Sequence, residues 1–428
     1  MAGACVVQIA LDDWLSSARL PAALKSAGLD VIAICDPASP LRLTRHLSSL
    51  VILDKGSELA ETLEGVVDRH KPVAVIPSDE RSLRRLQEIV TQQLGSAQLI
   101  ELLSRSLGSP RGYGTLTSKW ATAQLAQRLD IAVPAQTLVR TAAEAITFAR
   151  DTGFPVILKR ENTYGGMGCI VCRSETQIRL AIAKLRVASL LRRGKSSTEK
   201  FRPPEVHPLR EAFIAQRFHE GPLAFATCVA SNGNLVSGLA VIAEQVHPTP
   251  IGASTVICTL ERPDLLEISA KLIEATGCSG FVGVDFILDA TTGRPYLLEI
   301  NARVTPLCQA AALLGTDLCA AFAESFTGIP AGMSPRPTTD RIALFPGEWL
   351  RDPLSPNLKT AYHDVPIDDE ALIACARRRR PRSKSRWRNF EFRAFRQTDA
   401  TYTAETPAPI SAWTGRAVLQ AVSRRTER

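Results

Sequence analysis

Short apolar runs alternate with amphipathic stretches over the first 112 residues of the chain. Three of these runs have the composition of buried strands, and the stretches between them have the spacing of helices. Strands separated by helices predict a parallel sheet with helices over both faces. The predicted strands are Cys5–Ala10, Asp30–Cys35 and Pro72–Pro77, and the predicted helices are Ser16–Ala27, Glu58–Arg69 and Ser78–Gln93. No Gly-x-Gly-x-x-Gly follows the first strand, so a dinucleotide site in this unit is not supported.

The pattern changes after a glycine-rich loop at Gly108–Gly114. The runs 155–162 and 168–174 are predicted strands joined by TYGGMG, and the polar, basic stretch 192–208 is predicted to be an exposed insertion. Further strands are predicted at 211–218, 223–231, 235–245, 282–289 and 294–301, and helices at 118–129, 142–152, 175–191, 262–275, 306–314 and 317–326. Asn232-Gly233 lies between two apolar runs, which is a strong hairpin signal. Residues after 327 show less periodicity, with one short amphipathic helix expected near 417–422.

The net charge of the chain comes from one segment. The 428 residues include 51 Lys and Arg against 43 Asp and Glu, a formal charge of +8. The run RRRRPRSKSRWR at 377–388 holds eight of the basic residues and no acid, and the rest of the chain is balanced. This distribution argues against a uniformly basic nucleic-acid-binding surface and indicates one local basic segment. A hydrophobic content of 45% and a charged content of 22% are those of a globular protein.

The ten cysteines are scattered, mostly within apolar runs, which favours buried thiols in a reducing compartment over a disulfide framework. Cys169 and Cys172 form a Cys-x-x-Cys, but no second pair follows at zinc-finger spacing, so packed strand cysteines are expected. No apolar run has the length of a membrane span, and the N-terminus resembles a first strand more than a signal peptide. We therefore expect a cytoplasmic protein without a membrane partner.

Groups able to bind phosphate and metal occur in a fixed order along the chain. Lys119 and Lys159 can bind polyphosphate as point charges. The loop between the two predicted strands contains Gly165, Gly166 and Gly168, whose backbone amides can approach phosphate oxygens because glycine has no Cβ. Asp285, Glu299 and Asn301 lie on two consecutive predicted strands and supply hard oxygen ligands for Mg²⁺. Each residue alone has an ordinary structural explanation, but the ordered set favours a nucleotide site.

In these motifs the chain resembles the ATP-grasp superfamily of ATP-dependent ligases. The resemblance covers roughly residues 1–330 and rests on FPVILKREN, TYGGMG and above all GVDFILDATTGRPYLLEINAR. It implies an α/β and α+β chain with three parts: an N-terminal parallel-sheet domain (1–112), a two-lobed ATP-grasp domain (113–330) and a C-terminal extension (331–428). The lid lobe would cover about 120–218 and the metal-bearing lobe about 219–330.

The resemblance also implies a role for each matching residue. Lys159 and Lys119 would bind the nucleotide, and Gly165, Gly166 and Gly168 would cover its β- and γ-phosphates. Asp285, Glu299 and Asn301 would hold Mg²⁺, with Mn²⁺ as the alternative metal. Arg303 would stabilise the transferred phosphoryl group, and Ile287 would line the adenine pocket.

The hinge between the lobes departs from the family pattern at two positions. The chain has Gln216 where the family often has Glu, and Leu223 where it often has a ribose-binding acid. The backbone of Phe218 and His219 is expected to hydrogen-bond adenine, and Glu220 is the candidate for the ribose. Nucleotide preference is thus less firmly implied than phosphate and metal binding.

The resemblance implies a ligase that activates a carboxylate as an acyl-phosphate and joins it to an amine, with release of ADP and phosphate. Two alternatives stay open. One is a carboxylase or carbamoyl-phosphate type of enzyme that phosphorylates bicarbonate, although no Met-Lys-Met biotinylation segment is present. The other is a non-catalytic nucleotide- or nucleic-acid-binding protein, motivated by the basic segment 377–388. Small-molecule substrates are the expected partners, nucleic acid is not, and a homo-oligomer is left open.

Overall fold

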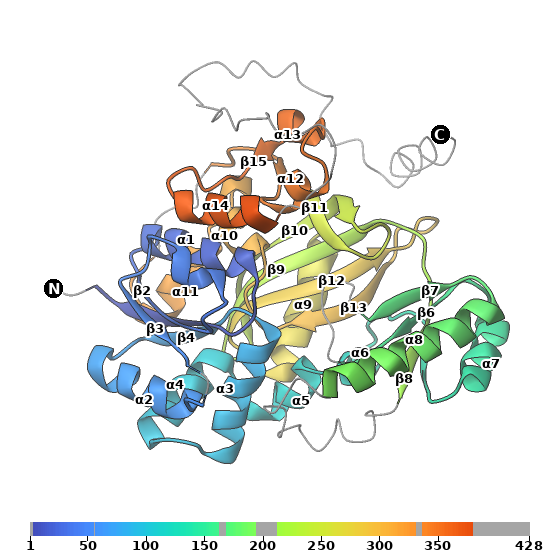
Figure 1. Ribbon diagram of the computed structural model, residues 1–428, viewed down its shortest axis with the longest axis horizontal. Helices are drawn as coiled ribbons and strands as arrows, with labels where there is room; N and C mark the ends of the chain where they lie inside the picture. The colour runs from blue at the N-terminus through green and yellow to red at the C-terminus, as the bar shows by residue number, and fades with distance from the viewer. Residues whose placement is uncertain (1–2, 55, 162–167, 194–211, 331–335, 380–428) are drawn as a thin grey trace.

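The computed structural model describes residues 3–54, 56–161, 168–193, 212–330 and 336–379. Figure 1 shows an N-terminal sheet on one side, a small antiparallel sheet on the other and a large sheet between them. The expected α/β and α+β architecture is confirmed, because the first sheet is parallel and the two following sheets are largely antiparallel. Gly165 and Gly166, the insertion at 194–208 and the helix expected near 417–422 lie outside the described residues.

The N-terminal sheet has four parallel strands in the order β3-β2-β1-β4. Its strands are β1 (Cys5–Ala10), β2 (Asp30–Cys35), β3 (Ser49–Ile52) and β4 (Ala74–Pro77). Its helices are η1 (Leu15–Arg19), α1 (Leu20–Ser26), η2 (Pro40–Leu43), α2 (Leu59–His70), α3 (Glu80–Gln92) and α4 (Ala97–Leu107). The sequence reading omitted β3 and α4. At four residues, β3 is too short to show a clear period.

The small sheet has the order β5-β8-β6-β7 and is antiparallel throughout. It consists of β5 (Gln136–Val139), β6 (Val156–Lys159), β7 (Cys169–Cys172) and β8 (Phe213–Arg217), covered by α7 (Ala142–Thr152) and α8 (Glu175–Arg193). Ile146 of α7 and Ile178 of α8 pack in one core with Val156 and Leu158 of β6. The connecting elements η3 (Pro110–Gly112), α5 (Tyr113–Leu116) and α6 (Lys119–Arg128) precede this sheet, and α6 packs on the large sheet rather than on the small one.

The large sheet has seven strands in the order β13-β12-β9-β10-β11-β14-β15. They are β9 (Leu223–Ser231), β10 (Asn234–His247), β11 (Ala253–Thr259), β12 (Gly280–Leu288), β13 (Pro295–Asn301), β14 (Arg341–Ala343) and β15 (Tyr362–His363). The predicted hairpin is confirmed, because Asn232 and Gly233 connect β9 to β10 with φ angles of 48° and 79°. The strand β11 was not predicted.

Helices cover both faces of the large sheet. On one face α9 (Pro263–Thr276) places Leu272 against Ala226 and Val284. On the other face α11 (Leu318–Thr327) places Phe322 against Phe281, with the two rings stacked 4.8 Å apart. The short elements α10 (Leu307–Ala310) and η5 (Ala311–Leu314) precede α11. Helices therefore cover both faces of the sheet that contains β12 and β13.

Residues 336–379, which the sequence assigned to a C-terminal extension, add two strands to the large sheet. Strand β14 pairs with β11, and β15 pairs with β14, so the described residues after 335 complete the large sheet. The helices α12 (Gly347–Arg351), α13 (Asn357–Thr360) and α14 (Glu370–Arg379) lie next to these strands (Figure 1). An ion pair of 3.0 Å between Arg19 and Asp364 ties this segment to the N-terminal domain. Pairing between strands so distant in sequence leaves no local signal.

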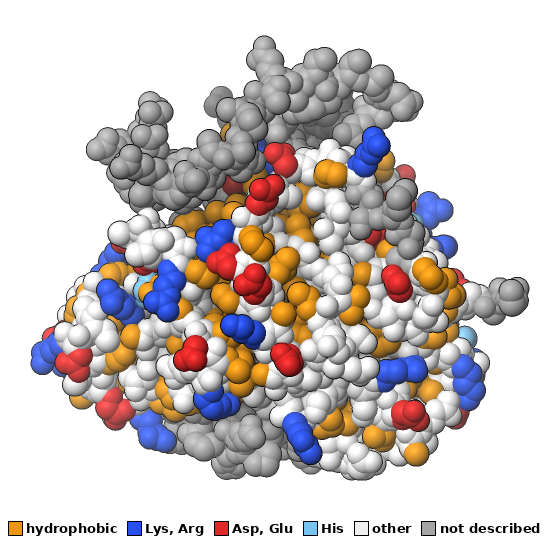
Figure 2. Space-filling view, turned by 180° about the vertical axis from the view of Figure 1, so that it is seen from behind, with side chains coloured by type: hydrophobic (Ala, Val, Ile, Leu, Met, Phe, Trp, Pro, Cys, Tyr) orange, Lys and Arg blue, Asp and Glu red, His pale blue; other side chains and the backbone are white. Residues whose placement is uncertain are grey.

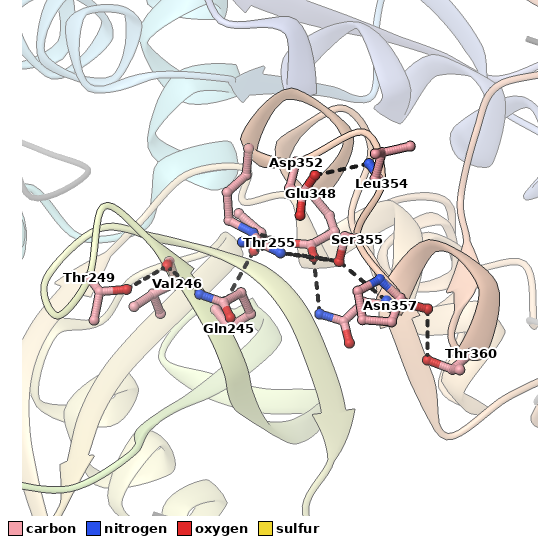
Figure 3. A network of polar contacts seen from close by, with 12 residues as sticks. Gln245, Val246, Thr249, Thr255, Glu348, Asp352, Leu354, Ser355, Asn357 and Thr360 are labelled. Atoms are coloured by element: carbon pink, nitrogen blue, oxygen red, sulfur yellow. Dashed lines mark hydrogen bonds and ion pairs between the residues drawn. The ribbon is translucent and has the colours of Figure 1, made fainter. Parts of the chain in front are cut away.

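A buried carboxylate anchors the C-terminal segment to the large sheet (Figure 3). Glu348 is fully buried and accepts hydrogen bonds from Thr255 Oγ1 of β11 at 2.6 Å and from Asn357 Nδ2 of α13 at 3.0 Å. Arg351 Nε donates at 2.8 Å, and Ser355 donates from its hydroxyl. The Glu348 carboxylate thus links β11 of the large sheet to Arg351, to Ser355 and to Asn357 of α13.

All ten cysteines are free thiols, and Cys169 and Cys172 lie on β7 as expected. Among the described residues no single helix is long and apolar enough to cross a membrane, and only the bent pair 307–314 with 318–327 passes by length and composition. On the face shown in Figure 2, basic and acidic side chains are interspersed.

Candidate active site

Two carboxylates face each other on neighbouring strands of the large sheet. Asp285 of β12 lies directly opposite Glu299 of β13 in the antiparallel register, so their side chains emerge on the same face. Asn301 follows two residues later on β13 and shares that face. Burial raises the pKa of Asp285, and the Glu299 carboxylate raises it further. Two partly buried acids at this spacing form a site that a cation would stabilise.

Two lysines from different elements reach this pair. Lys119, the first residue of α6, places its ammonium nitrogen 2.8 Å from Glu299 Oε2. Burial alone would raise the pKa of Glu299, but the Lys119 ammonium outweighs burial and holds that pKa below its ordinary value. Lys159 ends β6 and is buried, and burial lowers the pKa of its amine. The small sheet and the large sheet therefore each contribute charged groups to one site.

Arg303 lies just beyond β13 and contacts three other side chains. Its Nη2 donates to Asn301 Oδ1 at 2.9 Å, and its Nε lies 3.4 Å from Glu80 Oε2 of α3. Its guanidinium also lies over the ring of Trp14, 5.4 Å from the centroid. Glu80 and Trp14 belong to the N-terminal domain, so that domain supports the proposed catalytic arginine. The sequence reading assigned no site role to either residue.

A small polar cavity adjoins these groups between α3, the α5–α6 connection and β13. Glu80 and Arg84 lie one turn apart on α3, and Arg84 Nη2 is 3.3 Å from Glu80 Oε1. The remaining wall consists of Leu116, Thr117, Ser118, Lys119, Thr122, Glu299, Ile300 and Asn301. The cavity thus lies between β13 at the edge of the large sheet and α3 of the N-terminal sheet.

Only part of the glycine-rich loop can be placed. Gly168 has a φ of 74°, a conformation that favours glycine, and its carbonyl accepts a hydrogen bond from the amide of Arg160 at 3.1 Å. This bond closes the β6–β7 turn at its base. The role of Gly165, Gly166 and Gly168 over phosphate stays a prediction.

The predicted hinge residues run from the end of β8 in the small sheet to the start of β9 in the large sheet. Gln216 is buried and donates to Gln136 Oε1 of β5 at 2.8 Å, within the small sheet. The amide of Phe218 donates to the carbonyl of Pro155 at 3.2 Å, so an adenine contact at Phe218 would have to use its carbonyl.

The other hinge residues form a small group around β12 and β13. The ring centroids of His219 and Tyr296 lie 4.2 Å apart with the rings tilted by 33°, and His219 Nδ1 lies 3.4 Å from Asp289 Oδ2. Ile287 is buried beside Tyr296, and Glu220 is exposed, with its carbonyl accepting from Ala290 at 2.9 Å. The adenine and ribose roles of these residues stay predictions, as does the consequence of Leu223.

The candidate metal ligands Asp285, Glu299 and Asn301 all offer oxygen atoms. No group of three or more His, Cys, Asp and Glu side chains arranged for a metal occurs in the described part of the chain. The candidate set instead comprises two carboxylates and one amide oxygen, the hard donors that suit Mg²⁺ when phosphate oxygens and water complete its shell. The raised pKa of Asp285 agrees with a site that a divalent cation would complete.

Comparison with known proteins identifies the domain that contains these residues. Residues 116–306 match the family described as the ATP-grasp domain. These residues form an ATP-grasp domain. All of the proposed metal ligands, Lys119, Lys159 and Arg303 fall within the match, whereas Glu80 and Trp14 precede it.

Relatives of the ATP-grasp domain include both carboxylating and amide-forming enzymes. The large chain of carbamoyl phosphate synthase from Thermotoga maritima is 23% identical over 294 residues, which is 66% of this chain and 25% of that one. The biotin carboxylase domain of 2-oxoglutarate carboxylase from Hydrogenobacter thermophilus, crystallised with MgADP and bicarbonate, is 15% identical with a TM-score of 0.56 (77% and 71% covered). An L-amino acid ligase from Bacillus licheniformis is 14% identical with a TM-score of 0.52 (76% and 74% covered). At these identities the two structures establish the fold.

Proposed function

We propose that the chain is an ATP-dependent ligase that activates a carboxylate as an acyl-phosphate and joins it to an amine. The observation that carries the proposal is the facing pair of Asp285 and Glu299, with the Lys119 ammonium 2.8 Å from Glu299. Metal-binding carboxylates beside lysines are the components that phosphoryl transfer requires, because this reaction depends on positioning and charge neutralisation.

In this proposal each group has one task. Asp285, Glu299 and Asn301 would hold Mg²⁺, which supplies charge neutralisation for phosphate oxygens when bound. Lys119 and Lys159 bind the phosphates as point charges. Arg303, oriented by Asn301 and Glu80, contacts the transferred phosphoryl group or the acyl-phosphate.

The chemistry proceeds in two displacements. A carboxylate oxygen of the first substrate attacks the γ-phosphorus of ATP, the bond to the bridging oxygen breaks, and ADP leaves. The amine nitrogen then attacks the acyl carbon and phosphate leaves, with loss of one proton from nitrogen. The reaction requires no covalent bond to the protein.

A bicarbonate-phosphorylating enzyme is the second candidate. It is favoured by the similarity to carbamoyl phosphate synthase and to a biotin carboxylase domain crystallised with bicarbonate. The chain spans a quarter of the length of the first of these relatives, so the activity of that relative does not transfer as a whole. Both candidates use ATP and the same charged edge, and they differ in the acid that is phosphorylated.

The proposal also covers the cellular compartment, the substrates and the oligomeric state of the enzyme. Ten free thiols agree with a reducing compartment such as the cytoplasm. Small-molecule substrates fit a site formed by single side chains from three elements. The biotin carboxylase domain from Hydrogenobacter thermophilus is a dimer, and a dimer of this chain stays a proposal.

The experiment is an ADP-release assay with Mg·ATP against a panel of carboxylates, each with and without a panel of amino acids and amines. Mass spectrometry detects new amides, and a parallel series contains bicarbonate. Release of ADP that depends on a carboxylate and an amine, with formation of the amide, supports the ligase. Release with bicarbonate alone supports the second candidate. Full turnover in Glu299→Gln would show that the site assignment is wrong.

A further inference from the structure

A buried carboxylate outside the predicted site joins the two parts of the nucleotide site. Glu161 follows β6 by two residues and is only 8% exposed. Its Oε1 accepts from the amide of Trp120 at 2.8 Å and from Ser118 Oγ at 3.2 Å. Its Oε2 accepts from the amide of Lys119 at 3.0 Å. Three donors from the start of α6 therefore converge on one side chain from the small sheet.

These contacts complete the cap of α6. The first amides of a helix have no partner within the helix and carry a partial positive charge. Glu161 takes the amides of the first two residues, and Ser118 Oγ takes the amide of Ala121 at 3.1 Å. A carboxylate at this position is stabilised by both the hydrogen bonds and the helix dipole. The cap of α6 thus comes partly from the residues that follow β6 of the small sheet.

The position of Glu161 relates it to both proposed nucleotide lysines. It lies two residues after Lys159, and it binds the backbone of Lys119 directly. Lys119 in turn reaches Glu299 at 2.8 Å. A displacement of the small sheet relative to α6 would break the bonds of Glu161 and change the distance between the two ammonium groups.

We propose that Glu161 is a positioning residue that fixes Lys119 and Lys159 relative to each other for binding a nucleotide phosphate chain. The inference rests on the proposed function, since it takes the two lysines as phosphate ligands. Glu161 acts through the backbone of α6 and needs no contact with the nucleotide. The Glu161 carboxylate accepts hydrogen bonds from the three donors at the start of α6. Its role therefore differs from that of Asp285 and Glu299, the acids proposed to bind metal.

The test compares Glu161→Gln with wild type by calorimetric titration of ADP, with and without Mg²⁺. Gln keeps the size of the side chain but replaces one acceptor oxygen by a donor facing the helix amides. ADP binding should weaken by about tenfold or more, the range produced when a supporting residue around a ligand site is lost. Glu144→Gln is the matched control, because Glu144 accepts from the Arg140 amide at 2.8 Å and from Thr141 Oγ1 at 3.0 Å at the start of α7. The control should change ADP affinity by less than about twofold, since a lone capping change acts locally.

A double-mutant cycle distinguishes positioning from general destabilisation. If Glu161 acts through Lys119, its loss should matter much less in a Lys119→Met background, because the two effects are coupled. The inference is wrong if the effects of the two substitutions on ADP affinity are additive, or if Glu161→Gln binds ADP within about twofold of wild type. Either result would leave the proposed function standing. If wild-type protein binds no ADP, the proposed function and the inference both fail. If Glu161→Gln does not fold, Glu161→Asp, which withdraws the carboxylate by one methylene, is measured against the same criteria.

Discussion

Glu348→Gln should destabilise the protein strongly at neutral pH and weakly in acid. The carboxylate is fully buried and binds Thr255, Arg351, Ser355 and Asn357. Burial would raise its pKa, but the hydrogen bonds from Arg351, Ser355 and Thr255 prevail and lower it from 4.5 to about 2. A difference of this size corresponds to about 3 kcal/mol of folding free energy. Loss of one partner from a buried ion pair costs a similar amount, about 3–5 kcal/mol.

The sign of the pH dependence follows from the lowered pKa. The contribution of Glu348 is fully present above the ordinary value of 4.5 and is lost as the pH falls toward 2. Wild type should therefore lose its advantage over Glu348→Gln between pH 5 and pH 2.5, roughly the interval in which the wild-type side chain gains its proton.

Urea unfolding at pH 7 and pH 3.5, followed by far-UV circular dichroism and by tryptophan emission, measures the effect. Trp349 is buried next to the substituted residue and reports on the segment. Midpoints are compared because a chain of several sheets need not unfold in two states. Glu267→Gln, on the exposed side of α9, is the control. A Glu348→Gln midpoint equal to that of the control at pH 7, or an undiminished difference at pH 3.5, would refute the reasoning.

Three further predictions concern the site and the basic segment. Asp285→Asn should lower ADP release in the ligase assay by about 100-fold or more while metal-free ADP binding changes little, because a group that stabilises transition-state charge is lost; equal losses of binding and turnover would contradict the metal role. Arg303→Lys should lower kcat by about 100-fold with little change in KM, since lysine cannot contact Asn301 and Glu80 at once; a change in KM alone would assign Arg303 to substrate binding. Deletion of 380–428 should leave ADP affinity within about twofold of wild type, because every proposed nucleotide ligand precedes it; a larger loss, measured by the same titration, would place the basic segment in the nucleotide site.

The sequence predicted those parts of the fold that depend on local pattern. The Asn232-Gly233 hairpin followed from turn chemistry, and the placement of Asp285 and Glu299 on neighbouring strands followed from two apolar runs around a short turn. The short strand β3 was missed because four residues do not establish a period. The pairing of β14 with β11 was missed because it depends on contacts between residues more than 80 positions apart.

The same limit applies to the candidate site. Lys119, Lys159 and Arg303 could be proposed because their order matches a family motif. Glu161 could not, since its partners are backbone amides that any sequence would supply. Gln216 was expected near the nucleotide, yet its amide binds Gln136 within the small sheet, a choice that depends on rotamer and packing.

The late pairing of β14 has a consequence for biosynthesis. Until residues 341–343 have left the ribosome, β11 presents an open edge with unpaired backbone groups, which is a template for association with other chains. The Arg19–Asp364 ion pair likewise waits for the last part of the described chain. A nascent chain that holds every proposed catalytic residue would still expose this edge, so protection from aggregation during synthesis should depend on how quickly the residues from Arg303 to Ala343 are translated and leave the ribosome.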